Sequence, residues 1–211
     1  MLALVINLDR DSERLTLATS ELSKVNLTPT RVSAIPGSTL DHNESLMPNL
    51  NAAACWLSHV KSMQIFLESG FDLALICEDD LVIRNPKVFK RVLREASTLN
   101  NDITQLGFLT HGFLERLMNF RRWVISLRSS RSNYSRYIFV PDDFLAGTHC
   151  YLISRKGAKL LVSLNQPPSI AADGFMQGMV RAKSLQGMRT RKSYVDQRDG
   201  ISRITNQFER R

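Results

Sequence analysis

Short apolar runs alternate with longer segments of helical spacing along the first half of the chain. The runs are continuous and rich in branched side chains, which is typical of strands buried in a sheet. They occupy residues 2–7, 30–35, 73–77 and 103–109. The intervening segments repeat apolar residues with the period of a helix, over residues 11–25, 51–69 and 86–99. Strands that alternate with helices in this way predict an α/β fold with a largely parallel sheet.

Local signals mark the ends of these helices. Asp11 or Ser12 can cap the first helix, because a short polar side chain accepts hydrogen bonds from the first free backbone N–H groups. Gly70 provides a stop after the second helix. Asn85 followed by Pro86 is a typical cap and first-turn pair for the third helix.

The composition suits one globular domain over residues 1–211, with 43% hydrophobic and 23% charged residues. No stretch approaches the roughly 20 apolar residues of a membrane-spanning helix. The first residues also lack a basic leader, a long apolar core and a cleavage site, so we expect a cytoplasmic protein. Cys55, Cys77 and Cys150 stand at wide, unrelated spacings, which indicates reduced, buried thiols rather than a disulfide framework or a zinc site.

The formal net charge of +8 and the pI of about 9.8 imply a polyanionic partner, such as nucleic acid, an anionic membrane or a phosphate-bearing substrate. Basic residues concentrate in two places, which we call the basic segment (about 112–137) and the basic tail (from about 181). The basic segment mixes apolar side chains with Arg116, Arg121, Arg122, Arg128, Arg131 and Arg136. This mixture is typical of an amphipathic helix at an anionic membrane surface, which would place the protein peripherally on the inner membrane. A solvated helix and a lid over the acceptor are the alternatives.

Three consecutive carboxylates, Glu78, Asp79 and Asp80, follow the apolar run 73–77 directly. Ligands of open α/β sheets bind beyond the carboxyl ends of the strands, so the triplet lies where chemistry is expected. Adjacent carboxylates repel one another unless a cation compensates them. A hard divalent ion, Mn²⁺ or Mg²⁺, fits oxygen ligands best, and a basic side chain such as Arg84 is the alternative.

Three separated motifs narrow the choice of reaction. They are VINLDRDSERL near the N-terminus, the stretch from AACWLSHVK to ICEDDLVI, and GTHCYLISRKGAKLL from residue 147. Together they resemble glycosyltransferase family 25, over about residues 4–175. The resemblance implies a GT-A fold with a Rossmann-like, mostly parallel sheet flanked by helices. It also implies a UDP-sugar donor, often UDP-galactose, inversion at the anomeric carbon, a Mn²⁺ or Mg²⁺ ion, and a lipooligosaccharide or other glycan as acceptor.

The resemblance and the strand ends together suggest roles in donor binding. Alternate residues of an extended segment face the same way, so Glu78 and Asp80 are the expected metal ligands, with Asp80 direct and Glu78 on the metal or the ribose. The other expected donor contacts are Asn7, Leu8, Arg10, Arg14, His59, Asp79, Gly147, Thr148 and His149. For Arg10 and Arg14 the alternative is surface ion pairing. For His59 and His149 the alternative is a structural role. One departure from the family is Pro36 before Gly37, where relatives carry an Asp-Gly pair.

An inverting transfer needs a general base beside the acceptor hydroxyl. Asp173 occupies the position of an acid that follows the GTH helix in the family, and it is the expected base. Asp142 and Asp143 are the alternatives, and a capping role is the alternative for Asp173. Two competing functions stay open: a nucleic-acid-binding protein or metal-dependent nuclease, and a relative that binds nucleotide without turnover. The family resemblance favours a UDP-sugar and a glycan as partners, with no nucleic acid.

Overall fold

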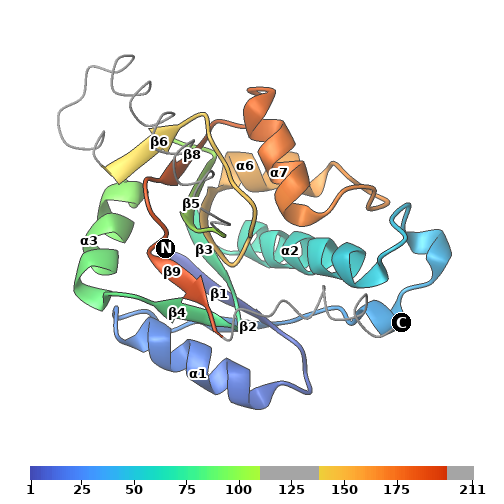
Figure 1. Cartoon of the computed structure of the whole chain (residues 1–211), viewed down its shortest axis with the longest axis horizontal. Coiled ribbons are helices and arrows are strands. Elements are labelled where there is room, and N and C mark those ends of the chain that lie inside the picture. The colour runs from blue at the N-terminus through green and yellow to red at the C-terminus, as the bar shows by residue number, and fades with distance from the viewer. Residues whose placement is uncertain (110–137, 199–211) are drawn as a thin grey trace.

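A mixed sheet forms the centre of the computed structural model, which describes residues 1–109 and 138–198 (Figure 1). Its strands in the described ranges are β1 (Leu2–Asn7), β2 (Thr30–Ser33), β3 (Leu73–Glu78), β4 (Leu81–Ile83), β5 (Ile103–Gly107), β6 (Phe139–Pro141), β7 (Cys150–Ser154), β8 (Gly187–Thr190) and β9 (Val195–Gln197). The strand order is β2-β1-β3-β7-β5-β8-β6, and β4 and β9 pair beside this path. Strands β1, β2 and β3 are mutually parallel, whereas β7 is antiparallel to both β3 and β5.

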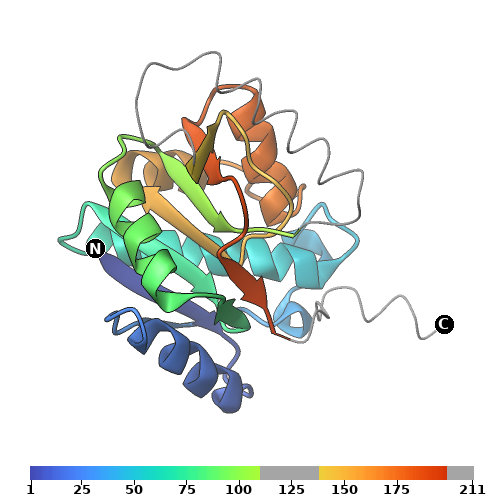
Figure 2. The same cartoon turned by 60° about the vertical axis from the view of Figure 1, so that its left-hand side comes forward.

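Helices cover both faces of this sheet (Figures 1 and 2). They are α1 (Ser12–Ser23), α2 (Leu50–Glu68), α3 (Pro86–Ser97), α6 (Arg155–Val162) and α7 (Ala172–Arg181). Two short 3-10 helices, Gly37–Thr39 and His42–Glu44, lie in the connection between β2 and α2. The predicted α/β class, with a sheet flanked by helices, is confirmed.

Side-chain alternation along the strands creates the two cores. Leu4 and Ile6 of β1 belong to one buried cluster with Trp56 of α2, and residues of α6 and α7 complete it. Val5, between them, points to the opposite face and packs in a second cluster with Leu22 of α1 and residues of α3. The period of two in a strand therefore explains why the central runs are apolar throughout.

The expected start of α3 is confirmed by a capping contact, whereas α2 ends one residue earlier than Gly70, with Ser69 as its C-cap. Asn85 accepts a hydrogen bond from the backbone N of Val88 at 3.1 Å, and α3 begins at Pro86. The side chain of Ser154 caps α6 through the backbone N of Gly157 at 3.1 Å. Asp11 is the N-cap of α1, although its side chain makes no capping hydrogen bond.

Part of the basic tail expected from about residue 181 belongs to the sheet, because residues 187–190 form β8 and residues 195–197 form β9. Strand β8 pairs in parallel with β5, inside the sheet. Arg189 of β8 is fully buried, because its guanidinium donates to Asp143 at 2.8 Å and lies over the ring of Phe108. The basic segment, 112–137, lies outside the described residues. Within the ranges that the structure describes, no helix has the length and apolarity needed to cross a membrane.

Candidate donor-binding and active site

The strand order brings the sequence motifs to one edge of the sheet. Strand β1 runs parallel to β3 with Ile6 opposite Glu78, so the residues that follow both strands leave the sheet together. Strand β7 runs the other way, and its first residue, Cys150, pairs with Cys77. The GTH motif, which precedes β7, therefore reaches the same edge as the acidic triplet.

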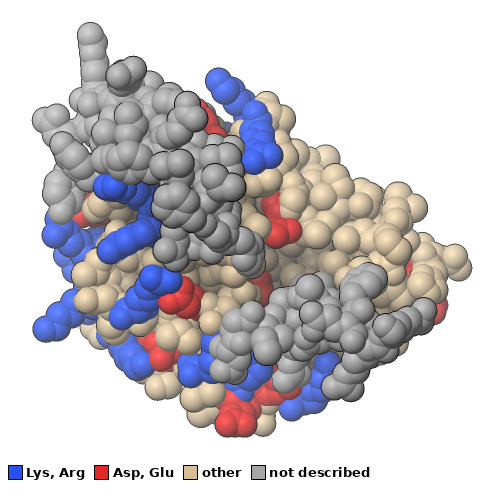
Figure 3. All heavy atoms as spheres, viewed as in Figure 1, with Lys and Arg blue, Asp and Glu red and all other residues tan. Residues whose placement is uncertain are grey.

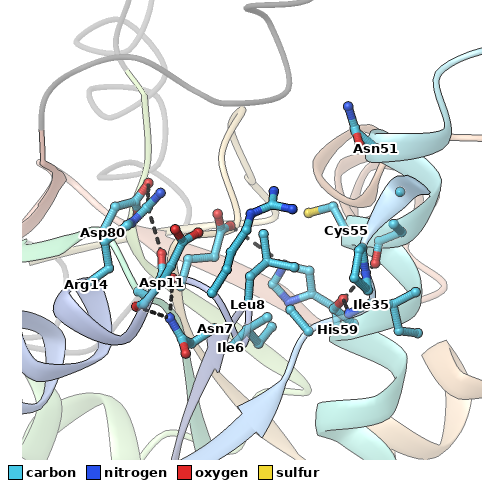
Figure 4. A pocket seen from close by; sticks show the side chains of 18 of the residues that line it. Ile6, Asn7, Leu8, Asp11, Arg14, Ile35, Asn51, Cys55, His59 and Asp80 are labelled. Carbon is cyan, nitrogen blue, oxygen red and sulfur yellow. Dashed lines mark hydrogen bonds and ion pairs between the residues drawn. The ribbon is translucent and has the colours of Figure 1, made fainter. Parts of the chain in front are cut away.

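A pocket of about 530 Å³ opens at this edge between α1 and α2 (Figure 4). Eight of the expected site residues line it: Asn7, Leu8, Arg10, Arg14, His59, Glu78, Asp79 and Asp80. Arg14, Asp11 and Asp80 lie on the α1 side, and Asn51, Cys55 and His59 lie on the α2 side (Figure 4). The pocket is therefore assembled from residues far apart in the sequence.

Arg14 is the cation that compensates the carboxylates on the α1 side. One of its terminal nitrogens lies 2.7 Å from Asp79 Oδ1 and 3.0 Å from Asp80 Oδ2. Asn7 is buried and donates to Asp79 Oδ2 at 2.8 Å, so its amide positions this carboxylate. Arg84, the basic partner considered from the sequence, instead pairs with Asp196 of β9 at 2.6 Å.

Ionisation of Asp80 is unfavourable in the folded protein. Burial raises its pKa from 3.8 to about 7, the charges of Glu78 and Asp79 add to this rise, and Arg14 opposes it. Asp80 Oδ2 also accepts from Gln197 at 3.4 Å, whereas Oδ1 is buried without a hydrogen-bond partner among the described residues. Burial likewise raises the pKa of Asp79, against the hydrogen bond from Asn7. Oδ1 of Asp80, a buried carboxylate oxygen without a partner among the described residues, is therefore a good ligand for a cation.

Glu78 faces the α2 side. Its Oε1 accepts from the hydroxyl of Thr148 at 2.9 Å and lies 3.7 Å from Nε2 of His59. Burial raises the pKa of Glu78, but His59, His149 and the Thr148 hydroxyl outweigh burial, so the pKa lies below its ordinary value. Glu78 and Asp80 thus line the same pocket with different partners.

The GTH motif supports the pocket but is not among the residues that line it. Thr148 holds Glu78, and the carbonyl of His149 accepts from the backbone N of Glu78 at 3.1 Å. His149 is buried, with Nε2 3.1 Å from the carbonyl of Val195, and burial lowers its pKa. Nε2 therefore donates to this carbonyl, which is the structural role considered for His149.

Asp173 also lies outside the pocket lining. It stands in the first turn of α7, where Oδ2 accepts from the backbone N of Gly147 at 3.1 Å and Oδ1 accepts from Gly174 at 2.8 Å. Asp173 thus ties α7 to the GTH motif. Of the two alternatives, Asp143 is buried in its ion pair with Arg189, and Asp142 is exposed.

Several lining residues were missed by the sequence analysis, among them Asn51, Cys55 and Gln197. Cys55 lies one helical turn before His59 on α2, a spacing that places both side chains on one face. Cys77 and Cys150 are buried as expected, but Cys55 is only half-buried. Desolvation still raises the pKa of the Cys55 thiol well above its ordinary value, and the charge of Glu78 adds to the effect. Gln197 arrives on β9, which no local signal connects with the acidic triplet.

Charged side chains are unevenly distributed over the face shown in Figure 3. Lysine and arginine lie beside acidic residues on the left and lower parts, whereas the right-hand part is mostly uncharged. The visible charge on this face is therefore mixed in sign.

Comparison with known proteins assigns the class of protein that carries this fold and site. The model of glycosyltransferase family 25, described as an LPS biosynthesis protein, matches residues 1–176. The chain belongs to glycosyltransferase family 25, and its role is the transfer of a sugar from a donor to a glycan acceptor.

Solved structures give a more distant likeness. The chain is similar to a glycosyltransferase involved in the glycosylation of the major capsid of PBCV-1, at 10% identity and a TM-score of 0.53, over 99% of this chain and 97% of that one. It is also similar to A197 from STIV, at 16% identity and a TM-score of 0.47, over 92% and 83% of the two chains. The likeness to the PBCV-1 glycosyltransferase shows the fold alone. A search of curated proteins finds no match.

Proposed function

We propose that the protein is an inverting, metal-dependent glycosyltransferase of the GT-A type that moves a hexose, galactose, from a UDP-sugar to a lipooligosaccharide or related surface glycan. The observation that carries this proposal is the charge arrangement at the carboxyl ends of β1 and β3. Carboxylates suited to a divalent cation lie there beside two arginines, Arg10 and Arg14. A nucleoside diphosphate needs both a cation on its phosphates and basic side chains around them.

The size and lining of the pocket support the binding of a nucleotide. Its volume of about 530 Å³ falls within the range of small-molecule sites, roughly 300 to 1,000 Å³. Leu8, Ile35 and Pro36 provide apolar surface for a flat base. Arg10 and Arg14 stand near the start of α1, where a phosphate group would also meet the positive end of the helix dipole.

The acidic residues fit a hard divalent cation. Asp80 Oδ1 is a buried carboxylate oxygen without a hydrogen-bond partner in the described part of the chain, and oxygen donors are what Mn²⁺ and Mg²⁺ prefer. Asp80 would hold the ion directly, with Glu78 as its second acidic ligand or as a contact to the ribose. When bound, such a cation neutralises the diphosphate and favours departure of the nucleotide.

Asp173 is the proposed general base. Its two backbone contacts fix the position of the carboxylate at the start of α7. Asp143 is a weaker candidate, because Arg189 already occupies its carboxylate. The base would remove the proton from the acceptor hydroxyl on the face opposite the leaving diphosphate.

Calorimetric titration with UDP, in the presence of Mn²⁺ or of EDTA, tests the donor assignment. We expect UDP to bind more tightly with Mn²⁺. A nucleic-acid-binding protein or nuclease would instead bind DNA or RNA with an affinity that falls steeply as salt rises. Binding of nucleic acid with such a salt dependence, and no binding of UDP, would favour that second function.

A further inference from the structure

The α2 side of the pocket carries a second, chemically different group of ligand atoms. A sulfur of Cys55, a ring nitrogen of His59 and a carboxylate oxygen of Glu78 lie within 4.8 Å of one another. Within residues 1–109 and 138–198, no other set of three or more such side chains is so close. Figure 4 shows Cys55 and His59 on α2, at the opposite side of the pocket from Asp80.

His59 is oriented as a metal ligand would be. It is fully buried, and its Nδ1 lies 3.0 Å from the hydroxyl of Tyr151. Nε2 has no hydrogen-bond partner among the described residues, and its 3.7 Å separation from Glu78 Oε1 exceeds hydrogen-bond length. A hydrogen on Nε2 would therefore be a buried, unsatisfied donor, whereas the tautomer in which Nδ1 donates to Tyr151 aims the Nε2 lone pair at Glu78.

The separations match a tetrahedral ion. Zinc bonds of about 2.3 Å to sulfur, and about 2.0 to 2.2 Å to nitrogen and oxygen, place the ligand atoms about 3.3 to 3.6 Å apart. The observed 3.7 Å between Nε2 and Oε1 is close to this value, and the 4.8 Å limit on the group requires only small side-chain movements. Thr148 and Tyr151 contact Glu78 and His59 as outer-shell partners of metal ligands do.

We propose that Cys55, His59 and Glu78 bind one Zn²⁺ ion, with the fourth position open to the pocket for water or a ligand. Three protein ligands and an open position are typical of reactive rather than structural zinc sites. The thiolate and imidazole favour Zn²⁺ over Mn²⁺ or Mg²⁺, which the all-oxygen group around Asp80 prefers.

Titration of the chelator-treated full chain with Zn²⁺ alone and with Co²⁺ alone, without nucleotide, tests the proposal. We expect one equivalent of Zn²⁺ to bind, and the Co²⁺ form to show thiolate-to-cobalt charge-transfer absorption. Cys55→Ser should abolish this absorption and lower Zn²⁺ affinity by more than about 100-fold, since even outer-shell changes cost roughly 10- to 100-fold. Tyr151→Phe, which removes only the hydroxyl contact to His59, should cost that smaller amount.

Two matched variants control for other sites. Cys150→Ala removes a buried thiol outside this group, and His42→Gln removes an exposed imidazole. Both should keep the charge-transfer band and the Zn²⁺ affinity. Circular dichroism checks that each variant is folded. An unchanged band and affinity in folded Cys55→Ser would overturn the proposal, as would loss of the band in Cys150→Ala alone.

The zinc group shares Glu78 and His59 with the donor pocket, but it can be tested separately from the donor assignment, because the probes are metal ions without nucleotide. Stoichiometric Zn²⁺ binding that depends on Cys55, together with no Mn²⁺-dependent UDP binding, would support the zinc site and contradict the proposed function. UDP binding that depends on Mn²⁺, without a cobalt-thiolate band, would support the proposed function and contradict the zinc site.

Discussion

Replacing Asp80 with asparagine should stabilise the metal-free protein and abolish its Mn²⁺-dependent binding of UDP. The pKa of Asp80 rises from 3.8 to about 7, chiefly through burial, so the folded protein retains a proton that the unfolded chain has already released. The difference corresponds to about 4 kcal/mol of unfolding free energy that the ionised carboxylate costs above pH 7. Because an acid with a raised pKa loses stability as pH rises, the cost is small near pH 4 and nearly complete at pH 8.

Urea unfolding in EDTA at pH 5 and pH 8 measures this cost. Part of this cost comes from repulsion by Glu78 and Asp79. Between pH 5 and pH 8 we therefore expect the unfolding free energy of the wild type to fall by about 2 kcal/mol more than that of Asp80→Asn. Asp72→Asn, at an exposed position, is the matched control and should behave like the wild type, within about 0.5 kcal/mol. Equal pH dependence of wild type and Asp80→Asn would refute the electrostatic reasoning.

Calorimetry on the same pair of proteins tests the metal role. Asparagine keeps the size of the side chain and one neutral oxygen but loses the charge that a hard cation needs. Mn²⁺-dependent UDP affinity should therefore fall even though stability rises. A mutant that binds UDP and Mn²⁺ as the wild type does would show that Asp80 is not the metal ligand.

Two further predictions concern the base and the basic segment. Asp173→Asn should lower transfer to the acceptor by roughly 10²- to 10⁴-fold with nearly unchanged UDP-sugar affinity, measured by turnover and calorimetry; if Asp142→Asn has this effect instead, the base lies before the GTH motif. Neutralising Arg121, Arg122 and Arg128 together should reduce co-sedimentation with anionic liposomes, since each basic group near such a surface contributes about 1 kcal/mol. Unchanged co-sedimentation would contradict the proposed position at the membrane.

The elements of the first half of the fold could be predicted from the sequence because their signals are local. Continuous apolar runs gave the central strands β1 and β3, and Asn85 with Pro86 gave the start of α3. Strands β8 and β9 were missed because they are short and polar, and their place in the sheet depends on pairing with distant strands. The burial of Arg189 is stabilised by Asp143, a contact that no local pattern contains.

The site shows the same division between local and distant information. The strand end predicted where the acidic triplet would lie, and the pocket is there. The basic side chain that pairs with the acidic triplet could not be predicted. Arg14 reaches Asp79 and Asp80 across the sheet edge, whereas Arg84, which is nearer in sequence, pairs with Asp196 of β9. The direction of β7 likewise decides that Thr148 holds Glu78.

The release of UDP from a panel of UDP-sugars tests the central claim most directly. The purified protein is incubated with each sugar in Mn²⁺ or in EDTA, and free UDP is measured. We predict release from UDP-galactose that requires Mn²⁺ and is lost in Asp80→Asn. Folded protein that binds UDP but releases it from none of the sugars would identify a silent relative, and release that proceeds equally in EDTA would contradict metal-dependent transfer.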